Sequence, residues 1–361
     1  MMEGNMNKKL KVIIGGVIVL LVILVISIMY MYYNGKQAVS TVGEDVIVEI
    51  NGNHAMVLNQ LDEAGLLKNK TVASLYVRLN TIDFKANTYI LNTNMDLHTI
   101  FTILETADFN YILQSRFTVI DGLTVPQIAQ TVAEFLNIDA NEVLETWSNR
   151  EYLESLIEDY WFLNSVILGD DIMFPLEGYL APQTYFVTET QPTIESLTAL
   201  MLHQTGVVLT EYKDQIEEFT INDETISVHE FLTFASIIQG ESLFPEDHAK
   251  IAGVFMHRLE IDLRLQSDLT VNYANQVTKI AVTFEDLKVN SKYNTYMYNG
   301  LPIGPVANVS TAIIEATLDY EETDNLFFFA IQGGTVIYTK TYQEHMREIS
   351  KAREEGLWLQ D

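Results

Sequence analysis

The N-terminal apolar run is the feature that most constrains this chain. Residues Val12–Tyr33 contain no charged side chain and consist mainly of Val, Ile, Leu and Met. A helix of this length covers the ~30 Å hydrocarbon core of a bilayer. Three lysines precede the run, and flanking lysines favour the cytoplasmic side of the membrane. We therefore predict a cytoplasmic N-terminus at 1–11, a single transmembrane helix at 12–33, a linker at 34–45 and an extracytoplasmic remainder.

A cleaved signal peptide is the alternative to a membrane anchor. The apolar region of such a peptide is usually ~7–15 residues long, which is shorter than this run. Ala38-Val39-Ser40 resembles a cleavage site only weakly. The sequence therefore favours a permanent, single-pass anchor in the cell membrane.

Composition excludes several functional classes. The formal net charge of −28 repels nucleic acid and anionic lipid, so neither is expected as a partner. The chain has no cysteine, which excludes disulfides and thiolate metal sites and fits an extracytoplasmic location. His248 and His257 are nine residues apart, a spacing that does not form a ligand pair on one helix. We expect neither a metal nor a cofactor.

A weak internal repeat follows the linker. A strand at Val46–Ile50, the turn Asn51-Gly52 and a helix are repeated about seventy residues later, where a strand at Phe117–Ile120 precedes Asp121-Gly122 and a second helix. In outline these units resemble the glycan-binding LysM unit, although strand–turn–helix is also a common element with no ligand. We predict a LysM-like α/β region at 46–165 and a second domain at 166–361.

A helix that begins at Ser227 and ends near Glu241 is the central element of the second domain. Ser227 and Glu230 have the spacing of a capping box, and apolar residues then recur at helical spacing. Glu241 projects from that apolar side, so its carboxyl group is expected to be poorly solvated and to hold a proton near neutral pH, as a general acid must. Gly240 would let a ligand approach. The alternative is that Gly240 ends the helix and Glu241 caps the next one in solvent.

Other polar residues lie in irregular segments that could line a cleft. Glu177 is flanked by proline and glycine, and its carboxylate is either a second acid in the cleft or an exposed loop group. Asp268 could simply cap a helix, but Gln266, Ser267 and Asp268 together offer the donors and acceptors that orient sugar hydroxyls. Tyrosines from Tyr293 onward, next to the rigid loop 300–305, suit a carbohydrate, with a tyrosine-rich core edge as the alternative.

The C-terminal part predicts a β-hairpin, with strands at 326–331 and 335–338 on either side of Gly333-Gly334, followed by a final helix from Tyr342. With the helices upstream, this gives an α+β fold: one transmembrane helix, a small LysM-like α/β region, and a mixed α+β domain that ends in the hairpin.

Six ordered motifs of this second domain resemble those of the YceG-like endolytic murein transglycosylases, and the anchor, LysM-like region and C-terminal domain follow the same layout. The motifs are Ala235–Glu241, Val254–Leu259, Leu265–Asp268, Tyr293–Tyr296, Gly300–Pro305 and Lys340–His345, and Leu176–Tyr185 is also similar. The catalytic glutamate of the family matches Glu241, whereas a first acid of the family motif is replaced by Gln239. Leu269, Ile303 and Val309 stand where the family usually has proline, and Gln183 where it has aspartate.

The resemblance implies non-hydrolytic cleavage of the MurNAc–GlcNAc β-1,4 bond in nascent peptidoglycan strands, which leaves 1,6-anhydroMurNAc ends and limits strand length. Glu241 is the implied acid and base. The residues implied to position the substrate are Glu177, Gln266, Ser267, Asp268, Tyr293 and Asn294. Implied partners are penicillin-binding proteins and cell-elongation proteins of the same membrane. The alternatives are a non-catalytic, membrane-anchored peptidoglycan-binding scaffold and a true hydrolase.

Overall fold

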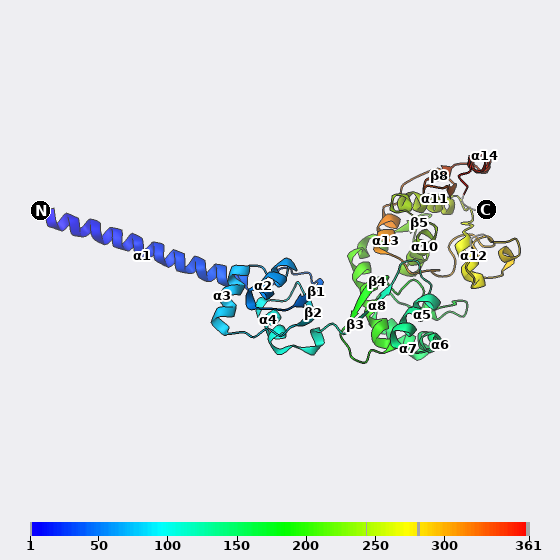
Figure 1. Ribbon diagram of the computed structural model, residues 1–361. Coiled ribbons are helices and arrows are strands. Elements are labelled where there is room, and N and C mark those ends of the chain that lie inside the picture. Colours follow the sequence, from blue (N-terminus) through cyan, green and yellow to red (C-terminus); the bar gives the residue numbers. More distant parts are fainter. Residues whose placement is uncertain (1, 243, 280–281, 359–361) are drawn as a thin grey trace. The chain divides into compact units, whose positions relative to one another are not determined.

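The N-terminal helix α1 (Met2–Gly35) is the first element of the computed structural model, which describes residues 2–242, 244–279 and 282–358 (Figure 1). Within α1, the apolar stretch 16–34 is not buried against the rest of the protein, and Gly35 at its end is buried next to Val72. This segment is long and apolar enough to cross a membrane, and it overlaps the span expected at 12–33.

The first compact unit consists of the chain up to Arg116 together with Phe186–Thr190. Strand β1 (Asp45–Ile50) pairs antiparallel with β2 (Asn87–Asn92). Alternate residues of both strands face one core, where they meet apolar residues of the helices. The helices are α2 (His54–Glu63), α3 (Lys70–Asn80) and α4 (Leu97–Thr106), and the 3-10 turn η1 (Phe109–Tyr111) follows them.

The second unit consists of Phe117–Tyr185 and the chain from Gln191 onward. Strands β3 (Ser115–Val119) and β4 (Gln183–Val187) pair with each other, and the chain crosses between the units within these strands. The intervening elements are α5 (Val125–Leu136), α6 (Ala140–Ser148), α7 (Arg150–Asp159) and η2 (Ser165–Leu168). The stretch from Ala140 to Asp159 thus forms two helices and not one continuous helix. The break is at Asn149, whose side chain accepts the Tyr152 amide and caps α7.

The boundary expected between residues 165 and 166 differs from the division in the structure. Residues 117–165 belong to the same unit as the C-terminal part, because β3 pairs with β4 and α5 packs against α8 (Ile194–Glu211). Both expected strand–turn–helix units are present, but they lie in different compact units and each strand has its own partner, β2 or β4.

Helices α10 (Val228–Glu241), α11 (His248–Glu260) and α13 (Thr311–Leu318) pack against one another in the second unit (Figure 1). Strands β7 (Phe327–Ala330) and β8 (Val336–Thr339) form the C-terminal antiparallel hairpin, and α14 (Tyr342–Glu354) packs on it. The shorter elements are α9 (Lys213–Glu217), β5 (Thr220–Ile221), β6 (Glu224–Thr225), η3 (Pro245–Asp247), α12 (Asp268–Asn275) and η4 (Asp286–Lys288).

A glycine packed against a proline supplies a test of this unit. Gly178 has a φ of +82°, and a Cβ atom there would come within 2.5 Å of the rigid Pro305 ring. Gly300 has nearly the same φ, +79°, with open space around the Cβ position. We expect Gly300→Ala to cost about 1 kcal/mol for the backbone conformation alone, and Gly178→Ala to cost a further 1–3 kcal/mol, roughly, for the clash. Urea denaturation of the full chain in detergent measures both. Equal losses would show that the contact with Pro305 does not constrain the fold.

Candidate active site

Glu241 is the last residue of α10, and the capping box expected at the start of that helix is present, with Ser227 and Glu230 bonded to each other's backbone amides. All residues from Phe231 to Ile238 are buried, so the helix passes through the core of the unit. Its C-terminal end brings the half-buried Glu241 to the first turn of α12.

The Glu241 carboxyl group is held by one short hydrogen bond. The Ser267 hydroxyl donates to Glu241 Oε1 over 2.6 Å. Burial is the main cause of a raised pKa for Glu241; the bond from Ser267 lowers it, the charge of Asp268 raises it, and Arg258 lowers it. The group is therefore easier to protonate than an ordinary glutamate, as its position on the apolar side of the helix predicts.

A second layer of hydrogen bonds fixes Ser267. Its backbone amide donates to Thr295 Oγ1 over 3.0 Å, and the amide of Gln266 donates to the Thr295 carbonyl over 3.2 Å. Thr270 and Thr295 join their hydroxyls at 2.8 Å. The Gln266 side chain, which directly precedes Ser267 in the chain, is exposed.

Asp268 does not have the capping role considered for it. Ser267 is the N-cap residue of α12 and Asp268 is its first helical residue, and neither side chain caps the helix. Asp268 Oδ1 instead accepts a hydrogen bond of 2.6 Å from the Tyr296 hydroxyl. The structure thus brings Glu241, Ser267 and Asp268 together, and Gln266 is the exposed residue that precedes Ser267.

Arg258 is a residue that the sequence reasoning missed. It is buried, its guanidinium donates to the carbonyl oxygens of Leu326 and Leu265, and its charge acts on Glu241. Because Leu265 directly precedes the Gln266–Asp268 segment, Arg258 also anchors the loop that carries Ser267. The sequence did contain a sign of this role: Arg258 lies on the helix face that otherwise consists of the apolar residues Ile251, Val254 and Phe255.

The sequence suggested that Gly240 would let a ligand approach, but the structure shows that it does not open the site. A Cβ atom at this position would lie 2.2 Å from Leu269 Cδ2, so the Leu269 side chain already fills the space. The missing side chain allows α10 and α12 to approach closely, and these helices are in contact. Leu269 is one of the positions at which this chain departs from the family pattern, and its packing on Gly240 explains how leucine is accommodated.

Glu177 is 1% exposed and differs from both expectations, an exposed loop group and an acid lining a cleft. Its two carboxyl oxygens accept the Val125 amide at 3.1 and 3.0 Å, and Tyr273 donates to Oε2 at 3.1 Å. Val125 is the first residue of α5, where a free amide needs an acceptor. Burial raises the pKa of Glu177 to about 8 against the opposing effect of these bonds.

Tyr293 and Asn294 are also buried, so the structure favours the core-edge alternative for them over direct sugar contact. The Tyr293 ring packs on Tyr273 with centroids 4.8 Å apart. Asn294 donates to the Leu287 and Val289 carbonyls at 2.9 and 2.8 Å. The Asn294 amide and the Tyr293 ring thus make internal contacts that position the segment that ends in Thr295 and Tyr296, whereas the buried Tyr293 hydroxyl has no hydrogen-bond partner among the described residues.

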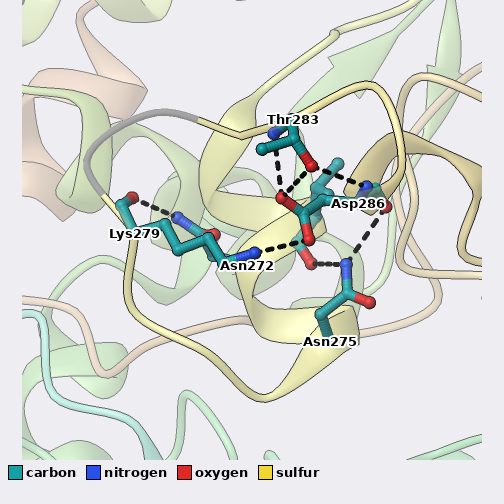
Figure 2. A network of polar contacts seen from close by, with 6 residues as sticks. Asn272, Asn275, Lys279, Thr283 and Asp286 are labelled. Atoms are coloured by element: carbon teal, nitrogen blue, oxygen red, sulfur yellow. Dashed lines mark hydrogen bonds and ion pairs between the residues drawn. The ribbon is translucent and has the colours of Figure 1, made fainter.

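The C-terminal end of α12 is held by a polar network centred on Asp286 (Figure 2). Lys279 pairs with Asp286 Oδ1 at 2.6 Å, Thr283 donates to Oδ2 through its amide and its hydroxyl, and Asn275 donates to the Asp286 carbonyl. The bond from Lys279 is the main cause of the fall of the Asp286 pKa to about 2. The network fastens the loop after α12 to the helix whose first turn carries Asp268.

Gln239, where the family pattern has an acid, has a defined structural use. Its amide nitrogen donates to Asp121 Oδ2 at 3.1 Å, and its amide oxygen accepts the Ser310 amide at 2.9 Å. An ionised glutamate could not donate to Asp121 and would repel it. Within residues 2–242, 244–279 and 282–358, no cluster of three His, Asp or Glu side chains could hold a metal ion.

Comparison with known proteins agrees with this architecture. The structure defines this class of protein: a mixed α+β chain that has one apolar N-terminal helix and a site with a half-buried carboxyl group. The sequence model of the YceG-like family matches residues 46–351, and the chain belongs to that family.

Individual relatives cover most of the chain. An endolytic murein transglycosylase of Bacillus subtilis is 32% identical over 328 residues, which is 89% of this chain and 88% of the relative. One from Streptococcus pneumoniae is 31% identical over 81% of this chain and 55% of its own length. A crystal structure of a yceG-like protein from Listeria monocytogenes matches with a TM-score of 0.61 and 33% identity, covering 85% of this chain and all of that one.

The raised pKa of Glu177 predicts a pH-dependent stability. A glutamate with an unfolded pKa near 4.5 and a folded pKa of about 8 binds its proton more tightly in the folded state. The contribution of this group to the free energy of unfolding is complete below the unfolded pKa. As pH rises from about 4.5 to about 8, the protein loses on the order of 3–5 kcal/mol of stability. Glu177→Gln keeps an acceptor for Val125 and removes the ionisation. Urea denaturation at pH 5 and pH 8.5 should show a smaller fall in the variant. The same fall in both proteins would contradict the assignment.

Proposed function

We propose that this chain is a membrane-anchored endolytic murein transglycosylase that cleaves MurNAc–GlcNAc β-1,4 bonds within glycan strands and leaves 1,6-anhydroMurNAc ends. The observation that carries the proposal is the Glu241 carboxyl group, held by Ser267 in surroundings that raise its pKa. The names of the relatives and the family membership support the substrate class.

A single carboxyl group serves both steps of the proposed reaction. Protonated Glu241 donates to the glycosidic oxygen as the bond from that oxygen to MurNAc C1 breaks. The resulting carboxylate then takes the proton of the MurNAc C6 hydroxyl, whose oxygen bonds to C1 and closes the anhydro ring. No water is consumed, so the second carboxylate of ordinary glycosidases is not required.

The surrounding residues have two different roles in this proposal. The half-buried Asp268 next to Glu241 and the exposed Gln266 of the same segment are assigned to substrate contact, and Ser267 orients the acid. The buried Tyr293, Asn294 and Glu177 support the frame rather than touch the sugar. An internal nucleophile needs the ring held in a reactive geometry, so this rigidity contributes to catalysis.

The remaining parts of the chain are assigned by the same proposal. Helix α1 anchors the protein with residues 1–11 in the cytoplasm and the site outside the membrane. The first unit, whose strand β1, turn and helix α2 resemble the LysM unit in outline, binds glycan strands. Cleavage limits strand length next to penicillin-binding proteins and cell-elongation proteins, and peptidoglycan is the substrate.

Glu241→Gln tests the acid directly. The amide keeps the size of the side chain and an acceptor for Ser267 but cannot donate an acidic proton. We expect anhydro-ended products to fall by about 10²–10⁴-fold, with the thermal unfolding midpoint and glycan binding unchanged. The measurement is mass spectrometry of muropeptides released from purified peptidoglycan.

The controls separate the alternatives. Unchanged anhydro products in the variant would refute the role of Glu241. Reducing ends in place of anhydro ends from the wild type would indicate a hydrolase, and binding without any cleavage would indicate a scaffold.

The pH–rate profile provides a second test, because two substitutions are expected to shift the pKa of Glu241 in opposite directions. Activity requires protonated Glu241, so its pKa sets the alkaline limb of the pH–rate profile. Ser267 lowers that pKa and Asp268 raises it. We expect Ser267→Ala to move the limb to higher pH and Asp268→Asn to move it to lower pH. Shifts in the same direction would show that the limb belongs to another group.

A further inference from the structure

A pocket is lined in part by the segment that follows Glu241 in the chain. It has a volume of about 520 Å³, and its walls are η3 and the start of α11, the segment before β7, and the turn and strand β8 of the C-terminal hairpin. The lining residues that bear charge are Glu246, Asp247, Lys250 and Glu321. This volume is in the range of small-molecule sites and far exceeds what a single ion needs.

Asp247 is a buried carboxylate in the wall of this pocket, and other residues hold it in place. It is 5% exposed, and its Oδ1 accepts a 2.8 Å hydrogen bond from Tyr338. Lys250 Nζ lies 3.9 Å from the same oxygen. Among the residues that the structure describes, no donor bonds Oδ2, and that atom is not sealed from solvent. A buried carboxylate with one free oxygen in a pocket needs a donor from a ligand or from water.

The charges define the ligand. Three carboxylates and one ammonium line the pocket, and the carboxylates of Glu246 and Glu321 form no ion pair within the described part of the chain. Such a site favours a ligand with an ammonium group, while Lys250 can receive a neighbouring carboxylate. The complementary ligand is therefore a peptide segment that carries an amine and a carboxylate close together.

The distance between the pocket and Glu241 limits the length of a ligand that could contact both of them. Glu246 is five residues after Glu241, so their Cα atoms are at most about 18 Å apart. Phe244, between them, packs against Gly334 of the hairpin turn, where a Cβ atom would lie 2.8 Å from the Phe244 ring. A peptide of three to five residues attached to a sugar at Glu241 can span this distance.

We propose that this pocket binds the stem peptide of the peptidoglycan substrate through the side-chain ammonium group of its diamino acid, an inference that rests on the proposed function. The ammonium group binds Asp247 Oδ2 with Glu246 and Glu321 nearby. The stem peptide thereby selects which sugar unit is placed at Glu241.

The test measures peptide binding without cleavage. The probe is L-alanyl-γ-D-glutamyl-L-lysyl-D-alanine with a fluorophore on its N-terminal amine, so that the lysine side chain holds the single free amine. Fluorescence polarisation with the full chain in detergent gives the Kd. We expect acetylation of that amine, Glu246→Gln and Glu321→Gln each to raise the Kd by about fivefold or more.

A matched control is Glu322→Gln, which makes the same charge change one residue along and does not line this pocket. It should leave the Kd unchanged, as should Glu241→Gln. Equal binding of the acetylated peptide, an equal loss in Glu322→Gln, or no saturable binding by the wild type would overturn the proposal. Peptide binding in a protein that releases no anhydro products would instead refute the proposed function and leave the pocket assignment intact.

Discussion

The hydrogen bond from Ser267 to Glu241 is the interaction on which the site depends. It joins the end of α10 to the start of α12, and it does so with a carboxyl group whose pKa burial has already raised. A hydrogen bond to a charged group limits that rise, and the negative charge of Asp268 adds to it. The balance makes one glutamate easier to protonate than an ordinary glutamate, which suits the acid and base proposed above.

The rest of the second unit holds α10 and α12 in fixed positions relative to each other. Leu269 packs into the space left at Gly240, Thr295 holds the backbone of Ser267, and Arg258 binds the carbonyl of Leu265. At the other end of α12, Tyr273 bonds to the buried Glu177, which in turn accepts the first amide of α5. Two residues that resemble substrate ligands in the sequence, Glu177 and Asn294, therefore serve as supports, each satisfying buried backbone groups.

Local patterns were sufficient to predict much of this arrangement. The spacing of Ser227 and Glu230 predicted the start of α10, and helical periodicity predicted the buried face that leads to Glu241. Burial of an individual side chain in a loop could not be predicted, because it depends on segments far apart in the sequence. Glu177 meets Val125 and Tyr273 across 52 and 96 residues, and no local pattern distinguishes it from an exposed carboxylate. The boundary between the units was missed for the same reason, since β3 and β4 pair across a long intervening segment.

The crossing of the chain between the units within β3 and β4 has a consequence for biogenesis. The first unit contains Phe186–Thr190, and the Gln114 amide in it bonds to the Val187 carbonyl at 3.0 Å. The ribosome must therefore synthesise about seventy residues of the second unit before the first can be completed. Until residue 187 has been made, β3 lacks its partner β4, so a chain that is shortened before that point presents an unpaired strand edge, which is a site for aggregation and proteolysis.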